Sequence, residues 1–172
     1  MINKKTMTRR KIREKVLQIL YAFEMTKDSI DAIKSEQLTG IEDKADELFA
    51  HRLIKLVMEN EEYYDKLIKS IVDNWDIERI AILDHIIIKM CLSEFIYMED
   101  IPTKVSMNEA IELAKNFSTK NSGKFVNGIL DSILIRMRKN GEIKKSGKGM
   151  VGEADLKKIP KKNVRSGMKH GK

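Results

Sequence analysis

The residues best suited to hold an anion are Lys124 and Phe125, near the start of a segment, 122–131, whose apolar residues recur at helical spacing. The first turn of a helix has free backbone N–H groups and the positive end of the helix dipole, and both attract phosphate. Lys124 adds a cation, and Phe125 adds a ring on which a base can stack. The pattern indicates binding of unpaired RNA, although Phe125 stands next to Val126 and could equally belong to the core.

A second basic cluster, with Arg9, Arg10 and Arg13, lies near the N-terminus at the start of a predicted helix over 9–26. A turn of about 100° per residue places Arg10, Arg13 and Tyr21 on one strip beside an apolar stripe. Guanidinium groups and a phenol ring on one face are typical of single-strand binding. The alternative is that these arginines are only solvated surface residues.

The net charge of +7 is unevenly distributed along the 172 residues. Residues 139–172 hold eleven Lys or Arg and three acidic residues, a net +8, and residues 1–15 hold seven and one, a net +6. Residues 16–138 therefore carry −7. This division predicts an anionic partner at the basic ends and a basic partner on the acidic body.

Other patterns exclude several classes of protein. No run of about 18 apolar residues is present, so we expect no membrane span, and the first residues do not form a signal peptide. The single Cys91 fits a reducing cytoplasm. The three histidines lack metal-ligand spacing, and no nucleophile–base pair is recognisable, so we expect no metal, no cofactor and no catalytic residue.

The body of the chain is predicted to be all-α, because its apolar residues follow a helical period and strand-like alternation is absent. The expected helices cover residues 9–26, 29–38, 45–59, 61–72, 77–96, 106–117 and 122–139. Leu48, Phe49, Leu53, Leu56 and Val57 are expected to face inward from the third. Residues 1–139 form the predicted domain. Residues 140–172 are too polar to form a core and are expected to be a disordered basic tail.

Local signals mark where several of these helices begin. Thr8, Asp43 and Asp76 are expected to cap the first, third and fifth helices, and Asn121 or Ser122 the last. The four residues 106–109, Ser-Met-Asn-Glu, match a capping box and predict that the sixth helix begins there.

Several short sequence pieces, at consistent distances over residues 8–138, resemble the NusB family, the bacterial transcription antitermination factor. They include the arginines of the first helix, Asp84 and Glu94 in the central helix, the run 108–115 and the run 124–128. The last two, in this order, are the specific ones. The second run also contains Gly128.

A glycine inside a helix costs about 1 kcal/mol relative to Ala, so a glycine at this position needs a reason. The favoured reason is close packing against another helix, and the alternative is close approach of the backbone to RNA.

The resemblance implies about seven helices in two packed bundles, and binding of the boxA element of nascent ribosomal RNA together with the ribosomal protein that acts as NusE. It implies a role in rRNA transcription within the RNA polymerase antitermination complex. Carried over by position, the expected RNA-binding residues are Arg9, Arg10, Arg13, Tyr21, Lys124, Phe125 and Asn127. The expected protein-partner residues are Asp84 and Glu78.

Asp84 is informative because an unpaired carboxylate in an apolar helix is costly to bury. It should either pair with Lys or Arg inside the fold or emerge at a partner interface, and the interface is the favoured alternative.

Three functions are compared: a non-catalytic RNA-binding adaptor, a protein-only scaffold, and a stand-alone relative of the N-terminal domain of rRNA cytosine methyltransferases. The adaptor is favoured, and monomer and homodimer both stay open.

Overall fold

The computed structural model describes residues 7–72 and 80–143, and within these ranges the chain forms seven α-helices and no strand. This confirms the predicted all-α fold. The helices are α1 (Arg9–Thr26), α2 (Ile30–Gln37), α3 (Lys44–Glu59), α4 (Glu61–Lys69), α5 (Ile82–Tyr97), α6 (Thr103–Phe117) and α7 (Ser122–Lys139). In the described ranges, no helix is both long and apolar enough to cross a bilayer.

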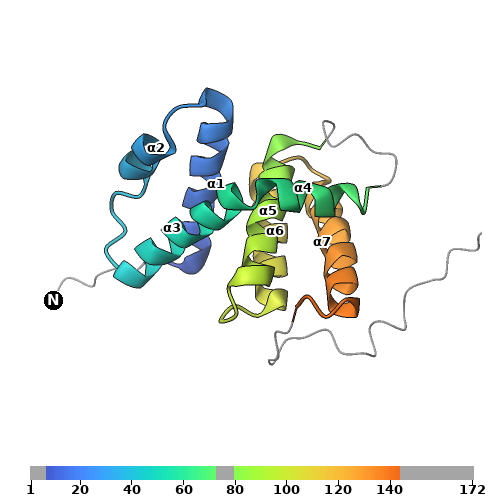
Figure 1. The fold of residues 1–172 in the computed structure, drawn as a ribbon. Coiled ribbons are helices and arrows are strands. Elements are labelled where there is room, and N and C mark those ends of the chain that lie inside the picture. Colours follow the sequence, from blue (N-terminus) through green and yellow to red (C-terminus); the bar gives the residue numbers. More distant parts are fainter. Residues whose placement is uncertain (1–6, 73–79, 144–172) are drawn as a thin grey trace, which may run out of the picture.

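The helices form two packed groups (Figure 1). α1 packs on α2 and α3, while α5, α6 and α7 pack on one another and α4 contacts α5 and α7. α5 also contacts α1 and α3, so it joins the groups. Every residue from Ile86 to Phe95 on α5 is buried, as its continuous apolar pattern predicts. Each fully buried Ile or Leu in this core contributes about 1.5–3 kcal/mol.

Two caps are where the sequence predicts them. The Thr8 hydroxyl accepts a hydrogen bond from the backbone N–H of Lys11 at 3.3 Å, so α1 begins at Arg9. The Asp43 carboxylate accepts from the N–H groups of Ala45 and Asp46 at 2.8 and 3.1 Å, at the start of α3. These short-range bonds satisfy backbone donors that have no partner inside the helix.

Two other starts differ from the prediction. α5 begins at Ile82 with Ala81 as its N-cap, and the expected cap, Asp76, lies outside the described residues. α6 begins at Thr103, directly after Pro102, so the predicted capping box at 106–109 is wrong. Proline suits this position because its φ is already near −60° and it has no N–H to satisfy.

The packed domain extends past the predicted boundary at 139. Ile143 is buried, and the backbone N–H of Glu142 donates to the carbonyl of Met137 at 2.9 Å. The rest of the predicted tail, 144–172, lies outside the described residues.

One core prediction is wrong. Leu48 is 69 % exposed, because α3 turns only the side with Phe49, Leu53 and Val57 toward α1 and α5.

Candidate nucleic-acid interface

Arg9 is held at the start of α1 by two contacts with α3. Its Nε lies 2.8 Å from Asp46 Oδ1, and its guanidinium carbon lies 4.4 Å from the centroid of the Phe49 ring. The side chain is still about half exposed. A cation held over a ring and beside a carboxylate loses part of its rotamer freedom before any ligand arrives.

Arg10 points to the other helix group and forms a two-pronged ion pair with Glu109 of α6. Its Nε and Nη2 donate to the two carboxylate oxygens at 3.0 and 2.8 Å. The hydrogen bond and the charge of Arg10 lower the pKa of Glu109. Arg10 is about half exposed, so its outer edge remains available to a phosphate.

Arg13 is not on the exposed strip, which corrects the sequence prediction. It is buried, and its Nε and Nη2 donate to Glu94 at 2.7 and 3.0 Å. The Ser106 hydroxyl donates to the same carboxylate at 2.5 Å. Arg13 therefore ties α1 to α5 and α6 instead of facing solvent. Its spacing to the buried Val16 and Leu17, at i+3 and i+4, could have indicated this.

The residues predicted at the start of α7 are on the surface. Lys124 and Asn127 are exposed, and Lys124 forms no ion pair with any described residue. Phe125 is half-buried and packs against the core, so both alternatives for its ring are partly right. Tyr21 is 37 % exposed.

A row of side chains on α6 connects the two basic patches. Glu109, the partner of Arg10, is followed one turn later by Glu112 and one turn after that by Lys115. The Lys115 Nζ lies 2.8 Å from Glu112 Oε1. The Lys115 side chain lies against Gly123, where an added Cβ would come within 2.8 Å of its Cγ. The α6 row, defined as Glu109, Glu112 and Lys115, thus runs from Arg10 to the turn that carries Lys124.

Tyr21 does not share this row. It lies eleven residues beyond Arg10, or about 16 Å along α1 at 1.5 Å per residue. Between the two, Arg13 and Leu17 are buried. The strip predicted on α1 is therefore interrupted. The α6 row, with two glutamates and one lysine, lies between the arginines at the start of α1 and Lys124 at the start of α7.

Gly128 has no packing role. An added Cβ would meet nothing within 4 Å, so the predicted close helix packing at this position is wrong. Close packing occurs instead at Gly123, five residues earlier.

Asp84 satisfies neither sequence alternative. It is only 5 % exposed, and its Oδ2 accepts a hydrogen bond from the Ser122 hydroxyl at 2.8 Å. No Lys or Arg among the described residues pairs with it, and its burial leaves little of its surface for a protein partner to contact. Glu78, the other predicted partner residue, lies outside the described residues.

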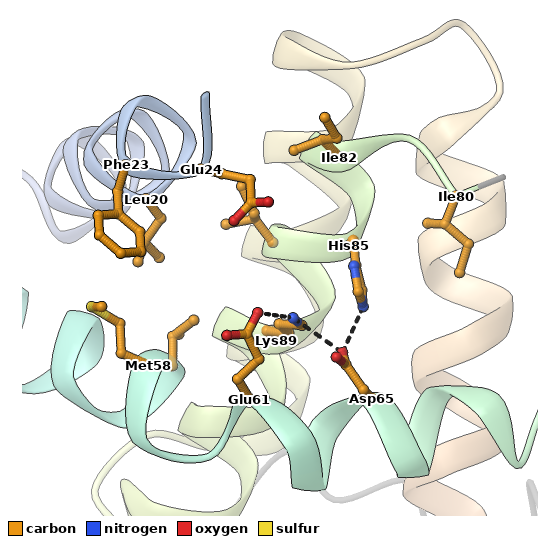
Figure 2. Close-up of a pocket in the computed structure, with 12 residues that line it drawn as sticks. Leu20, Phe23, Glu24, Met58, Glu61, Asp65, Ile80, Ile82, His85 and Lys89 are labelled. Carbon is orange, nitrogen blue, oxygen red and sulfur yellow. Dashed lines mark hydrogen bonds and ion pairs between the residues drawn. The ribbon is translucent and has the colours of Figure 1, made fainter. Parts of the chain in front are cut away.

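The structure also shows a cleft that no sequence pattern predicted. It lies between α1, α3, α4 and α5, has a volume of about 270 Å³, and combines apolar walls with acidic groups (Figure 2). Leu20, Phe23 and Ile82 form part of its walls, and Glu24 and Glu61 belong to its lining.

A chain of ionisable side chains crosses one side of this cleft (Figure 2). The buried Lys89 Nζ lies 2.8 Å from Glu61 Oε1 and 3.0 Å from Asp65 Oδ1, and His85 Nε2 lies 2.8 Å from Asp65 Oδ1. Burial, and then the charge of Lys89, lower the pKa of His85. Both pairs are four residues apart, 61 with 65 and 85 with 89. Residues four apart lie on the same side of a helix, so this spacing could have predicted an acidic side on α4 and a basic side on α5 that face each other.

Comparison with known proteins gives a consistent result. The model of the NusB family matches residues 10–134. Transcription antitermination protein NusB of Chloroherpeton thalassium is 39 % identical over 146 residues, which cover 84 % of this chain and 69 % of that one. The structure of T. maritima NusB matches with a TM-score of 0.70 and 36 % identity, covering 74 % of this chain and 91 % of that one. Antitermination factors NusB and NusE in complex with dsRNA match in fold, with a TM-score of 0.67 and 20 % identity, over 74 % and 96 %.

Proposed function

The chain belongs to the NusB family of transcription antitermination proteins, and from this we propose that it is a non-catalytic adaptor that binds an unpaired, boxA-like RNA. We further propose that it does so together with the basic ribosomal protein that acts as NusE. In this role it assists rRNA transcription as part of the RNA polymerase antitermination complex.

The observation that carries the RNA half is the exposed Lys124 beside Phe125, linked through the α6 row to the half-exposed Arg9 and Arg10. Phosphates of a single strand would lie along the cations, and the exposed edge of Phe125 would contact a base. Asn127 is on the same exposed turn and Tyr21 is a more distant contact. Arg13 is left out of the contact set because it is buried.

For the ribosomal partner, the cleft between the helix groups replaces Asp84 as the proposed binding surface. Its lining includes three carboxylates, of Glu24, Glu61 and Asp65, and one lysine, Lys89, while its walls are apolar. Glu24 also forms an ion pair, at 2.9 Å, with Lys27 at the end of the same helix. An acidic, concave, partly apolar surface suits a basic protein segment with an apolar anchor.

The test is an anisotropy titration of the full chain with a boxA-like oligonucleotide and with the same bases scrambled, each with and without the ribosomal partner. We expect tighter binding to the boxA-like strand and a further gain with the partner. Equal affinity for both strands would favour the protein-only scaffold. The comparisons favour the adaptor over the methyltransferase relative, since the relatives found are transcription antitermination proteins.

A further inference from the structure

The carboxylate of Asp84 is buried at the junction of α5 and α7, and no Lys or Arg among the described residues pairs with it. Its Oδ2 accepts from the Ser122 hydroxyl at 2.8 Å, and its Oδ1 accepts no hydrogen bond from the described residues. A buried carboxylate is costly unless charge or hydrogen bonds compensate it. Here the compensation comes from one strong hydroxyl donor and from the positive ends of two helix dipoles. Asp84 lies in the first turn of its own helix, α5, and Ser122 is the first residue of α7.

Ser122 is also the centre of the turn between α6 and α7. Its Oγ accepts from the backbone N–H of Thr119 at 3.1 Å and lies 2.8 Å from Thr119 Oγ1 and 3.0 Å from Ser118 Oγ. A hydroxyl has one proton to donate. The charged carboxylate is the strongest acceptor within reach, so the Ser122 proton goes to Asp84 and the other two hydroxyls orient around it.

The turn is fixed from a second side by α6. Gly123 is buried against the Lys115 side chain, so the backbone can move toward α6 only if Lys115 shifts as well. Lys124 and Phe125 follow directly. The direction in which both side chains leave α7 is therefore set by a backbone segment held between Asp84 and Lys115.

We propose that Asp84 is a positioning residue for the nucleic-acid surface: by holding the Ser122 hydroxyl, it fixes the first turn of α7 and so aims Lys124 and Phe125. The RNA part of this inference rests on the proposed function, whereas the positioning of the turn does not. The inference predicts an unusual sign. Removing an acidic residue should strengthen binding to RNA by charge alone, yet removing Asp84 should weaken it.

Amide hydrogen exchange on the full chain tests the positioning without RNA. The variants are Asp84→Ala, Ser122→Ala and the conservative Asp84→Asn, which keeps a side-chain oxygen that can accept the Ser122 proton. The matched control is Asp131→Ala, which removes an exposed carboxylate from α7, the helix whose first turn is being tested. We expect exchange over 122–126 to be about tenfold faster or more in the two Ala variants at 84 and 122, and mostly restored in Asp84→Asn.

Two results would overturn the positioning role. One is exchange over 122–126 no faster in Asp84→Ala than in Asp131→Ala. The other is equal acceleration in α3, which would mean a general loss of stability. Should Asp84→Ala fail to fold, Ser122→Ala decides by the same comparison, since it removes the hydroxyl and leaves the carboxylate.

A double-mutant cycle with Lys124→Ala then tests the consequence for RNA. If Asp84 acts by aiming Lys124, the loss of affinity in the double variant should be smaller than the product of the single losses by about threefold or more. Independent losses, or stronger binding of Asp84→Ala, would refute the link to RNA. Absence of RNA binding by the unaltered chain would refute the proposed function instead, while the exchange data would still decide the positioning.

Discussion

Arg10 and Arg13 lie one helical turn apart on α1, yet their environments give them different roles. Arg10 pairs with Glu109 at the surface, and Arg13 pairs with Glu94 in the core. Both pairs use two parallel N–H···O bonds, but solvent screens only the outer one. A buried pair is strongly destabilised when one partner is lost, because the other charge then remains uncompensated.

Replacing Arg13 should therefore cost far more stability than replacing Arg10. We expect Arg13→Ala to lower the free energy of unfolding by about 3–5 kcal/mol, measured by urea denaturation. Arg10→Ala is the matched control and should change stability little. A double variant, Arg13→Met with Glu94→Leu, should recover part of the loss. Equal, small effects of both arginine variants would contradict the assignment of Arg13 to the core.

His85 should make stability depend on pH in a defined direction. Burial and the Lys89 charge lower its pKa from 6.5, so the folded protein keeps the imidazole neutral while the unfolded chain takes up a proton near pH 6.5. The stability that neutral His85 contributes is complete above about pH 6.5 and is lost as the pH falls below it. The difference in unfolding free energy between the unaltered chain and His85→Gln should shrink from pH 7.5 to 5. Parallel curves would show that the shift is absent.

α7 carries two glycines with opposite surroundings, and α6 is responsible for the difference. At Gly123 the helices approach so closely that a Cβ would meet Lys115, whereas at Gly128 the added group would stand in open space. The first glycine is thus required by packing. The second only makes the helix backbone more flexible.

The two glycines form an internally matched pair for mutagenesis. Gly128→Ala should raise the unfolding free energy by about 0.5–1 kcal/mol through helix propensity, while Gly123→Ala should lower it because Lys115 or α7 must shift. Urea denaturation of both variants measures this. Destabilisation by Gly128→Ala would show that its surroundings are not open. Weaker RNA binding by this variant, at higher stability, would indicate that RNA approaches the backbone there.

For the molecule as a whole, charge is divided between two surfaces on different helices. Cations of α1 and α7 lie at the two ends of the α6 row, and carboxylates line the cleft between α1, α3, α4 and α5. Such a division allows one ligand of each charge to be bound at the same time. The two surfaces can be altered separately, which makes both assignments testable.

The salt dependence of RNA binding reports the cationic surface. Replacing both Arg9 and Arg10 with Ala should flatten the slope of log affinity against log salt by about 1.4 units, or 0.7 for each lost phosphate contact. Lys66→Ala with Lys69→Ala, on exposed positions of α4, removes the same charge away from that surface. The control should leave the slope nearly unchanged. An equal change in both pairs would mean that only net charge matters.

Charge reversal at the cleft should separate the two ligands. Glu24→Arg should weaken binding of the basic ribosomal partner by roughly tenfold or more, since it sets like charges against each other, and should leave RNA binding alone unaffected. Glu36→Arg, on the exposed side of α2, makes the same change outside the cleft. Calorimetric titration with the partner measures both. Unchanged partner affinity in Glu24→Arg would place the interface elsewhere.

The seven helices were predictable because helical periodicity and caps such as Thr8 and Asp43 depend on neighbours within four residues. The exposed Lys124, and the family itself, could also be read from short motifs. Partners distant in sequence could not: Glu94 lies 81 residues from Arg13, and Ser122 lies 38 residues from Asp84. The sequence shows that Arg13, Asp84 and Glu94 stand among apolar residues of predicted helices. Only the packing of α1 and α7 on α5 decides whether each charge meets a buried partner or reaches the surface.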